Sequence, residues 1–143
     1  MLVSEPDRSV CLASRMKRIL FVCVENSNRS QMAQAFARME GGADVDARSA
    51  GSRPSGVINP RAIRAMAELS YDLTSHASTS LDDIADAEFD AVLTMGCGDA
   101  CPAVPARIRE DWALPDPRDM DEVQYREVRD DIRARVRDLL ARL

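Results

Sequence analysis

The chain has 143 residues, of which 30% are charged, and its formal net charge is -5. This length suits a single domain with its own hydrophobic core, and charges of mixed sign argue against the basic surface that binds nucleic acid. No apolar stretch approaches the roughly 20 residues of a membrane span, so neither a membrane nor a nucleic acid is expected as a partner.

The N-terminal segment, residues 1–15, is polar, contains Pro6 and lacks periodicity, which predicts a loose tail. It carries charges where a signal peptide would have its apolar centre, so we expect a cytoplasmic protein. Met16 resembles a second start of the same protein, and one domain is expected over residues 16–143. Cys11, within the tail, is expected to have no role.

The first half of that domain predicts strands and helices in alternation. Residues 18–23 form a short apolar run that is typical of a buried strand. Ser30 is a good N-cap for a helix that should run to about Glu40, before a pair of glycines. A second strand is expected over residues 45–50. Asn59-Pro60 should open the next helix, because proline is favoured at the first helical position.

The second half continues the pattern, with a short helix, a strand, a short strand and a long amphipathic helix. These elements are expected at residues 80–84, 89–95, 109–113 and 120–143. The alternation predicts an α/β fold, a single-domain three-layer sandwich with a four-stranded parallel sheet and helices on both faces. In such sheets the binding crevice lies at the carboxyl ends of the strands.

A cysteine is followed six positions later by an arginine twice, at Cys23 to Arg29 and at Cys101 to Arg107. The second pair encloses two prolines, which lack the backbone N–H groups that an anion-binding loop needs, so we interpret it as a coincidence. The first pair keeps every N–H and precedes a helix N-terminus, which predicts an oxyanion site. The expected oxyanion ligands are Val24, Glu25, Asn26, Ser27, Asn28, Arg29 and Ser30.

Cys23 lies where the first strand passes into the first helix. Backbone N–H groups and the helix dipole favour a thiolate there, which predicts a nucleophile. Arg29 can bind two oxygens of a tetrahedral oxyanion in a fixed fork. The Ser30 hydroxyl can donate to the thiolate. A buried structural cysteine at a strand end is the alternative, and it would need none of these partners.

The segment VCVENSNRSQMAQAFAR resembles the phosphate loop of low-molecular-weight protein tyrosine phosphatases and of the arsenate reductases built on the same fold. The likeness extends from about Lys17 to the C-terminus. It implies that Cys23 is the nucleophile, that Arg29 binds the oxyanion, and that Asp116, in an Asp-Pro pair, is the general acid. From the residues alone, Asp116-Pro117 is equally well a turn.

The segment TMGCGDACP, with Cys97 and Cys101, resembles the cysteine-bearing segment of these reductases, and Cys97 should share a sheet edge with Cys23. Arg118-Asp119 stands where the phosphatases carry tyrosines. The resemblance therefore implies an arsenate reductase for arsenic detoxification. Attack of Cys23 on arsenate is followed by transfer of the oxidation to a Cys97–Cys101 disulfide, for which residues 96–105 are expected to move.

The implied enzyme holds no tightly bound cofactor and no metal, since a lone C-x3-C pair is a poor zinc site. Its electrons would come from thioredoxin, or from mycothiol or glutathione with a glutaredoxin-like protein. Phosphate and sulfate are expected to compete with arsenate, and a monomer is expected. A low-molecular-weight protein tyrosine phosphatase, and a non-catalytic thiol-redox or arsenical-sensing module, stay open as alternatives.

Three residues call for separate expectations. Asn28 stands where many relatives have a further loop cysteine, so no disulfide within the loop is expected. Glu25 brings a negative charge into an anion-binding loop and should point outward. His76 is expected to be a surface or helix-capping residue rather than a base.

Overall fold

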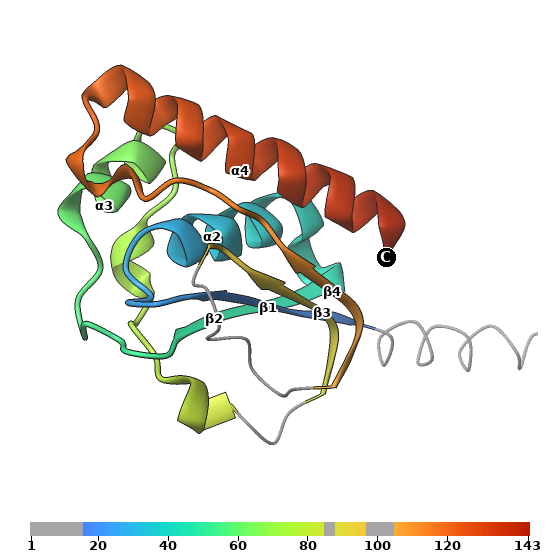
Figure 1. The fold of residues 1–143 in the computed structure, drawn as a ribbon. Coiled ribbons are helices and arrows are strands. Elements are labelled where there is room, and N and C mark those ends of the chain that lie inside the picture. Colours follow the sequence, from blue (N-terminus) through green and yellow to red (C-terminus); the bar gives the residue numbers. More distant parts are fainter. Residues whose placement is uncertain (1–15, 85–87, 97–104) are drawn as a thin grey trace, which may run out of the picture.

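The computed structural model describes residues 16–84, 88–96 and 105–143, and in these ranges one parallel sheet organises the chain (Figure 1). The sheet has the strand order β2-β1-β3-β4, and every pairing is parallel. The predicted four-stranded parallel sheet is therefore confirmed. The strands are β1 (Lys17–Cys23), β2 (Val45–Gly51), β3 (Phe89–Thr94) and β4 (Ala106–Asp111).

The α-helices of the described residues cover one face of the sheet (Figure 1). They are α2 (Arg29–Gly41), α3 (Pro60–Ala67) and α4 (Glu122–Arg142). Alternate residues of β1 divide between the faces, as the period of a strand requires. Ile19 and Phe21 join the core beneath the helices, whereas Leu20 and Val22 face a smaller cluster that includes the 3₁₀ turn η3 (Leu81–Ile84).

The helix boundaries follow from local chemistry. Asn59 caps α3, its side chain accepting from the Arg61 N–H at 2.8 Å, with Pro60 at the first position as predicted. Asp121 and Gln124 form a capping box, so α4 begins just after the Met120 expected from periodicity. Gly42 ends α2 with φ 58, a conformation that favours glycine.

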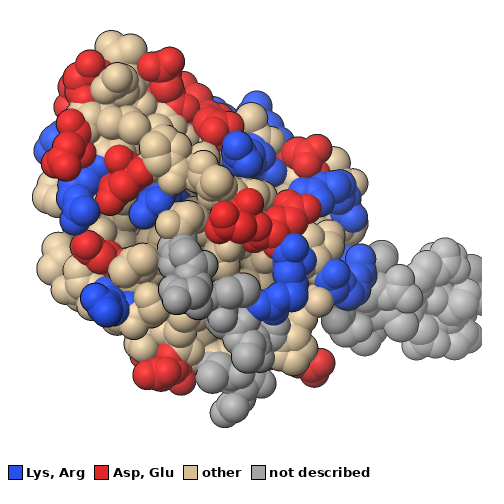
Figure 2. Space-filling model, viewed as in Figure 1, with Lys and Arg blue, Asp and Glu red and all other residues tan. Residues whose placement is uncertain are grey.

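Charged side chains of both signs are interspersed over the face shown in Figure 2, without a broad surface of one sign on its described part. Among the helices of the described ranges, none is both long enough and apolar enough to cross a membrane. The expected tail with Cys11, and the segment with Cys97 and Cys101, lie outside the described residues.

Candidate active site

The loop between β1 and α2 lies at the carboxyl end of a central strand, where the sheet topology predicted a binding site. The end of β2 passes very close to this loop. A Cβ atom on Gly51 would lie 2.4 Å from the Val24 carbonyl oxygen and 3.0 Å from the Asn26 nitrogen, so only glycine permits the approach. A residue outside the loop thus shapes it.

The carbonyl groups of loop residues 24–28 all accept hydrogen bonds from outside the hollow that the loop encloses. In a planar trans peptide the C=O and the following N–H point in opposite directions, so the N–H groups of residues 25–29 turn inward. The loop therefore presents a ring of donors, as an oxyanion requires. The donors to the carbonyls of Val24, Glu25, Asn26, Ser27 and Asn28 are Arg53 N (2.8 Å), Ser55 N (3.0 Å), Gln31 Nε2 (2.9 Å), Asn59 N (3.1 Å) and Met32 N (3.0 Å).

Asn26 supplies the sharpest turn of the loop. Its φ of 52 lies in the left-handed region, which asparagine tolerates better than most residues. The side chain is fully buried: its oxygen accepts from the Thr79 N–H at 2.7 Å, and its nitrogen donates to Ser30 Oγ at 2.8 Å. Both ends of the amide are thus used to hold the loop.

Cys23 forms the floor of the hollow, with 3% of its surface exposed and its Sγ 2.9 Å from Ser30 Oγ. The Ser30 oxygen accepts from Asn26, which leaves its own proton available to the sulfur. The prediction that Ser30 caps the helix is wrong. Asn28 holds the N-cap position, and Ser30 lies in the first turn because its hydroxyl is used by Cys23 and Asn26.

Arg29 is fixed from the far side of the pocket. Its Nη1 donates to the carbonyl oxygens of Met95 at 2.8 Å and Leu114 at 3.0 Å. Its Nε is buried, and no acceptor among the described residues lies within hydrogen-bond reach. Buried donors are nearly always paired, so this nitrogen is free to donate to an acceptor that enters the pocket.

These groups line one pocket of about 210 Å³, together with the predicted acid, Asp116. Asp116 also caps the 3₁₀ turn η4 (Pro117–Asp119), its carboxylate accepting from the Arg118 N–H at 3.0 Å. The turn and the functional interpretations of the Asp-Pro pair are thus compatible. The lining residues are Cys23, Val24, Glu25, Ser27, Asn28, Arg29, Asp116 and Arg118.

Arg118 also lines this pocket, although it was not among the predicted catalytic or oxyanion-binding residues. Its guanidinium lies 3.2 Å from a Glu25 carboxylate oxygen and 3.2 Å from an Asp116 oxygen. Glu25 is exposed, as expected, and it is paired. Arg118 lies 93 positions from Glu25, and a contact of that separation leaves no periodic signal in one sequence.

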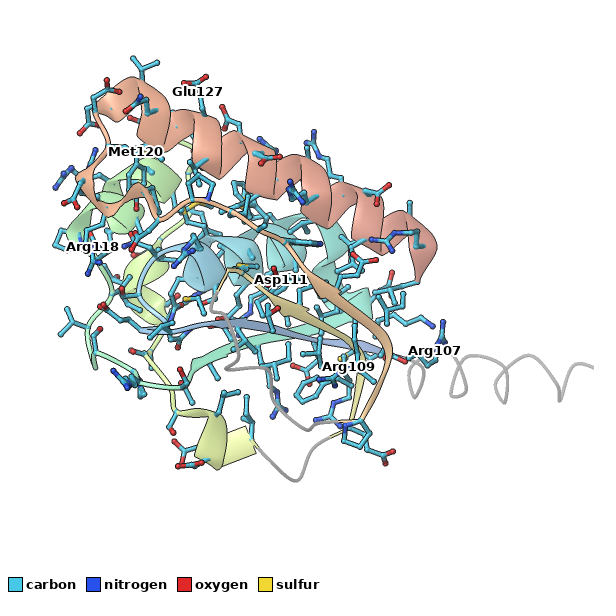
Figure 3. The ribbon with its side chains drawn as sticks, in the orientation of Figure 1. Arg107, Arg109, Asp111, Arg118, Met120 and Glu127 are labelled. Carbon is cyan, nitrogen blue, oxygen red and sulfur yellow. The ribbon has the colours of Figure 1, made fainter. Side chains whose placement is uncertain are left out.

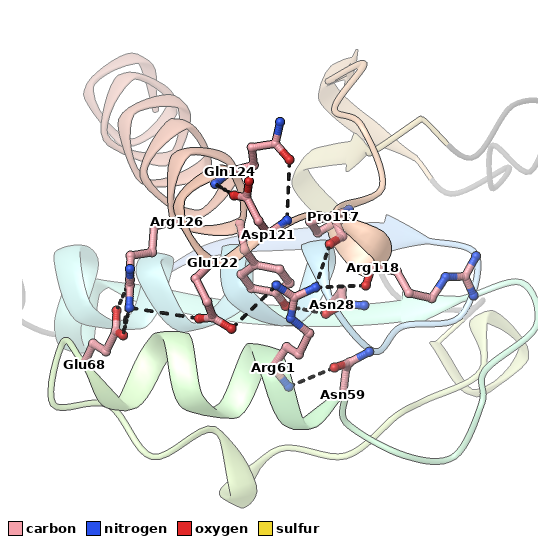
Figure 4. Close-up of polar contacts among 11 residues, drawn as sticks. Asn28, Asn59, Arg61, Glu68, Pro117, Arg118, Asp121, Glu122, Gln124 and Arg126 are labelled. Atoms are coloured by element: carbon pink, nitrogen blue, oxygen red, sulfur yellow. Dashed lines mark hydrogen bonds and ion pairs between the residues drawn. The ribbon is translucent and has the colours of Figure 1, made fainter.

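A second set of unpredicted residues joins the loop to the Asp116 turn (Figure 4). The Tyr125 hydroxyl donates to Asn28 Oδ1 at 2.5 Å, and burial raises the pKa of this tyrosine. The Arg61 guanidinium lies 4.6 Å from the centre of the Tyr125 ring. Its Nη1 donates to the carbonyl oxygens of Arg118 at 3.0 Å and Pro117 at 3.5 Å. We name Arg61 and Tyr125 the turn brace.

His76 was expected to be a surface or helix-capping residue, and only the capping role is confirmed. Its backbone ends a 3₁₀ turn, but its half-buried ring lies between the Tyr71 hydroxyl, 2.6 Å from Nε2, and Gln31 Oε1, 2.9 Å from Nδ1. Burial, with the nearby Arg38 charge, lowers the pKa of His76 to about 4. The ring is therefore neutral at neutral pH, and it orients the Gln31 amide that holds the Asn26 carbonyl.

Gly96 is the last described residue before the segment that holds the predicted relay cysteines. Its backbone N–H donates to Asp111 Oδ1 at 3.1 Å, and a Cβ on it would lie 3.4 Å from Arg29 Nη1. The described chain thus reaches the active-site arginine immediately before Cys97, which itself lies outside the described residues. Arg107, near the start of β4, lies at the amino ends of the strands, whereas the pocket lies at their carboxyl ends (Figure 3).

Comparison with known proteins identifies relatives over most of the chain. Residues 18–143 match the family described as low molecular weight phosphotyrosine protein phosphatase. A protein of Staphylococcus xylosus named arsenate reductase is 38% identical over 130 residues, covering 88% of this chain and 98% of that protein. A glutaredoxin arsenate reductase of Synechocystis sp. (strain ATCC 27184 / PCC 6803 / Kazusa) is 36% identical over 131 residues, or 90% and 99% of the two chains.

A solved structure agrees with these relatives. It is described as an arsenate reductase in the phosphate binding state, and it superposes with a TM-score of 0.81 at 37% identity. The superposition covers 89% of this chain and 98% of that one. The family match over residues 18–143 includes both the loop and the Asp116 turn.

Proposed function

This chain belongs to the low molecular weight phosphotyrosine protein phosphatase family, and we propose that within it the protein is an arsenate reductase that converts arsenate to arsenite for detoxification. The observation that carries the proposal is the hollow itself, in which the Cys23 sulfur faces inward-turned amide groups beside the buried Nε of Arg29. The names of the relatives favour arsenate over a phosphate ester.

Arsenate would occupy the hollow as a tetrahedral oxyanion. Its oxygens would accept from the N–H groups of residues 25–29 and from Arg29 Nε, which thereby gains its partner. These donors are held by bonds on their outer side, so little reorganisation is needed as charge develops during attack. Phosphate and sulfate share the tetrahedral shape and would compete.

The first chemical step joins sulfur to arsenic. The Cys23 thiolate attacks arsenic, and a hydroxyl leaves as water after taking a proton from Asp116, which lines the same pocket. Ser30 donates to the sulfur before attack and holds it in place at the base of the hollow. The product is a Cys23–arsenic(V) adduct.

The next steps reduce arsenic with two thiols. The Cys97 thiolate attacks the Cys23 sulfur, and the electron pair of the sulfur–arsenic bond passes to arsenic, which leaves as arsenite. The Cys101 thiolate then attacks Cys97, which releases Cys23 and leaves a Cys97–Cys101 disulfide. Both residues lie outside the described ranges, and their roles rest on the resemblance of their segment to that of related reductases.

An external thiol must reduce that disulfide for a second turnover. We propose thioredoxin, or a glutaredoxin-like protein with glutathione or mycothiol, and one similar protein is named for glutaredoxin. Residues 16–143 would act as a monomeric domain without a tightly bound cofactor. The cytoplasm suits this chemistry because its thiols are kept reduced.

Arsenite release with each donor supplied separately tests the proposal. We expect turnover with at least one donor, none for Cys23→Ser, and at most a single turnover for Cys97→Ser and Cys101→Ser. Cys11→Ser, which changes a cysteine outside the relay, is the control and should match the wild type.

Hydrolysis of p-nitrophenyl phosphate, measured beside arsenite release, addresses the phosphatase alternative, which is supported by the family alone. A phosphatase needs only water to release its thiol ester. Efficient hydrolysis of p-nitrophenyl phosphate that is independent of Cys97 and Cys101, without arsenite release, would therefore replace our proposal with the alternative.

A further inference from the structure

Arg118 joins the two sides of the pocket. Its Nη1 lies 3.2 Å from Glu25 in the loop, and its Nη2 lies 3.2 Å from Asp116 in the turn. Its backbone is held as well, since the N–H donates to Asp116 and the carbonyl accepts from Arg61. The backbone of Arg118 is thus held in place, and its guanidinium contacts the side chains of both Glu25 and Asp116.

The exposed fractions place this group at the mouth of the pocket rather than at its floor. The side chains of Arg118, Glu25 and Asp116 are 55%, 46% and 41% exposed, whereas Cys23 is 3% exposed. Figure 3 shows Arg118 on the turn that precedes α4. An incoming anion therefore passes the three charged side chains before it meets the sulfur.

The charges around the mouth explain why Glu25 is tolerated in an anion-binding loop. Without Arg118, the lining would carry the positive charge of Arg29 against the Glu25 carboxylate and the Cys23 thiolate, and Asp116 would add a further negative charge once it has given up its proton. An arsenate or phosphate ion would meet net negative charge, which lowers both its affinity and its rate of entry. Glu25 has no other ion-pair partner among the described residues.

We propose that Arg118 is a specificity-determining residue, which neutralises Glu25 and selects compact inorganic oxyanions over phosphate monoesters. This inference rests on the proposed function of the pocket. Among the described residues the lining holds no aromatic ring, and a guanidinium bridges the mouth where an aryl group would have to lie. Arg118 therefore favours a small, fully charged anion and disfavours an aromatic leaving group.

Binding of inorganic phosphate, measured by titration calorimetry on the reduced protein, tests the charge argument. We expect Arg118→Ala to weaken binding about tenfold, since it leaves an exposed carboxylate beside the anion. Glu25→Gln should bind phosphate as tightly as the wild type or more tightly. The double variant should return to within about threefold of the wild type, because the repulsive charge is gone.

One further variant tests whether the charge of Arg118 is what matters, and a second is a control. Arg118→Lys keeps the charge and should recover most of the affinity. Arg135→Ala removes an arginine paired with Asp131 on the remote part of α4 and should leave binding unchanged. Hydrolysis of p-nitrophenyl phosphate gives the second readout. The ratio of its kcat/KM to the association constant of inorganic phosphate should be about tenfold higher in Arg118→Ala than in the wild type, because the mouth of the pocket is then open to an aryl group.

The possible failures are distinguishable. If the wild type does not bind phosphate, the proposed function of the pocket is wrong. If the wild type binds and Arg118→Ala binds equally well, the proposed function stands and the role of Arg118 is wrong. A double variant as weak as Arg118→Ala would also overturn the inference, because Glu25 would then not be the group that Arg118 neutralises.

Discussion

Single residues of the pocket act through pairs of hydrogen bonds. Ser30 accepts from Asn26 and faces the Cys23 sulfur, so the orientation of one amide determines where the serine proton points. The Asn26 carbonyl is held in turn by Gln31, which the neutral His76 ring orients. The geometry of the loop therefore depends on Gln31 and His76, which lie outside the lining of the pocket.

The protonation of His76 should be visible in the pH dependence of stability. An ordinary histidine binds its proton near pH 6.5, whereas the pKa of His76 in the folded protein is about 4. Between these values the unfolded chain binds more protons than the folded chain, so the contribution of His76 to the free energy of unfolding is present above pH 6.5 and is lost as pH falls toward 4.

Urea unfolding of the wild type and of His76→Asn over this pH range measures the effect. The variant lacks the titrating ring and should be less stable at neutral pH, and the difference between the two proteins should shrink as the pH falls. A constant difference across the range would show that the ring is not buried in its neutral form.

Among the pocket residues, those that belong to a recognisable local pattern in the chain could be predicted from the sequence. Cys23, Arg29 and Asp116 belong to short local patterns, and the structure brings them to one pocket. Arg118 and the turn brace of Arg61 and Tyr125 were missed. Their long-range contacts join residues 56 to 97 positions apart, and a single sequence carries no periodic signal for such contacts.

Among the elements, the turn that carries Asp116 is held by α3 and α4. Arg61 on α3 lies over the Tyr125 ring on α4 and donates to two carbonyl groups of the turn (Figure 4). Tyr125 reaches the loop through Asn28, so loop, turn and helices form one connected unit. Small misplacements of a catalytic group are costly, so if Asp116 is the proposed acid, we expect Arg61 to act as a positioning residue.

Replacement of Arg61 by methionine keeps the long side chain and removes the donors. We expect the kcat for arsenate to fall about 10- to 100-fold, because Asp116 is less well placed, with little change in phosphate affinity. Arg61→Lys should recover part of the rate. Arg64→Met, an exposed change on the same helix, is the control. A loss confined to phosphate affinity would contradict a positioning role.

The elements were predictable where their pattern is local. β1 and β3 are apolar runs, and both were found close to their predicted bounds. β4 was expected at residues 109–113 and lies at Ala106–Asp111, because this edge strand alternates between half-buried and exposed residues and has no apolar run.

On the scale of the whole molecule, the site exists only in the folded chain. The proposed nucleophile and oxyanion loop come from residues 23–30, whereas the carbonyl groups that hold Arg29 and the proposed acid come from residues 95–116. The core beneath α2 and α4 fixes these segments relative to each other, since packed side chains resist displacement. The exposed ion pairs on α4 contribute less, because solvent screens them.

The most direct test of the central claim is the rate at which iodoacetamide labels Cys23 at neutral pH, read by mass spectrometry with and without phosphate. We expect Cys23, although buried, to be labelled about tenfold or more faster in the folded protein than in the urea-unfolded chain, and we expect saturating phosphate to stop the labelling. Labelling that is slower in the folded protein and unaffected by phosphate would show that Cys23 is a structural cysteine rather than a nucleophile.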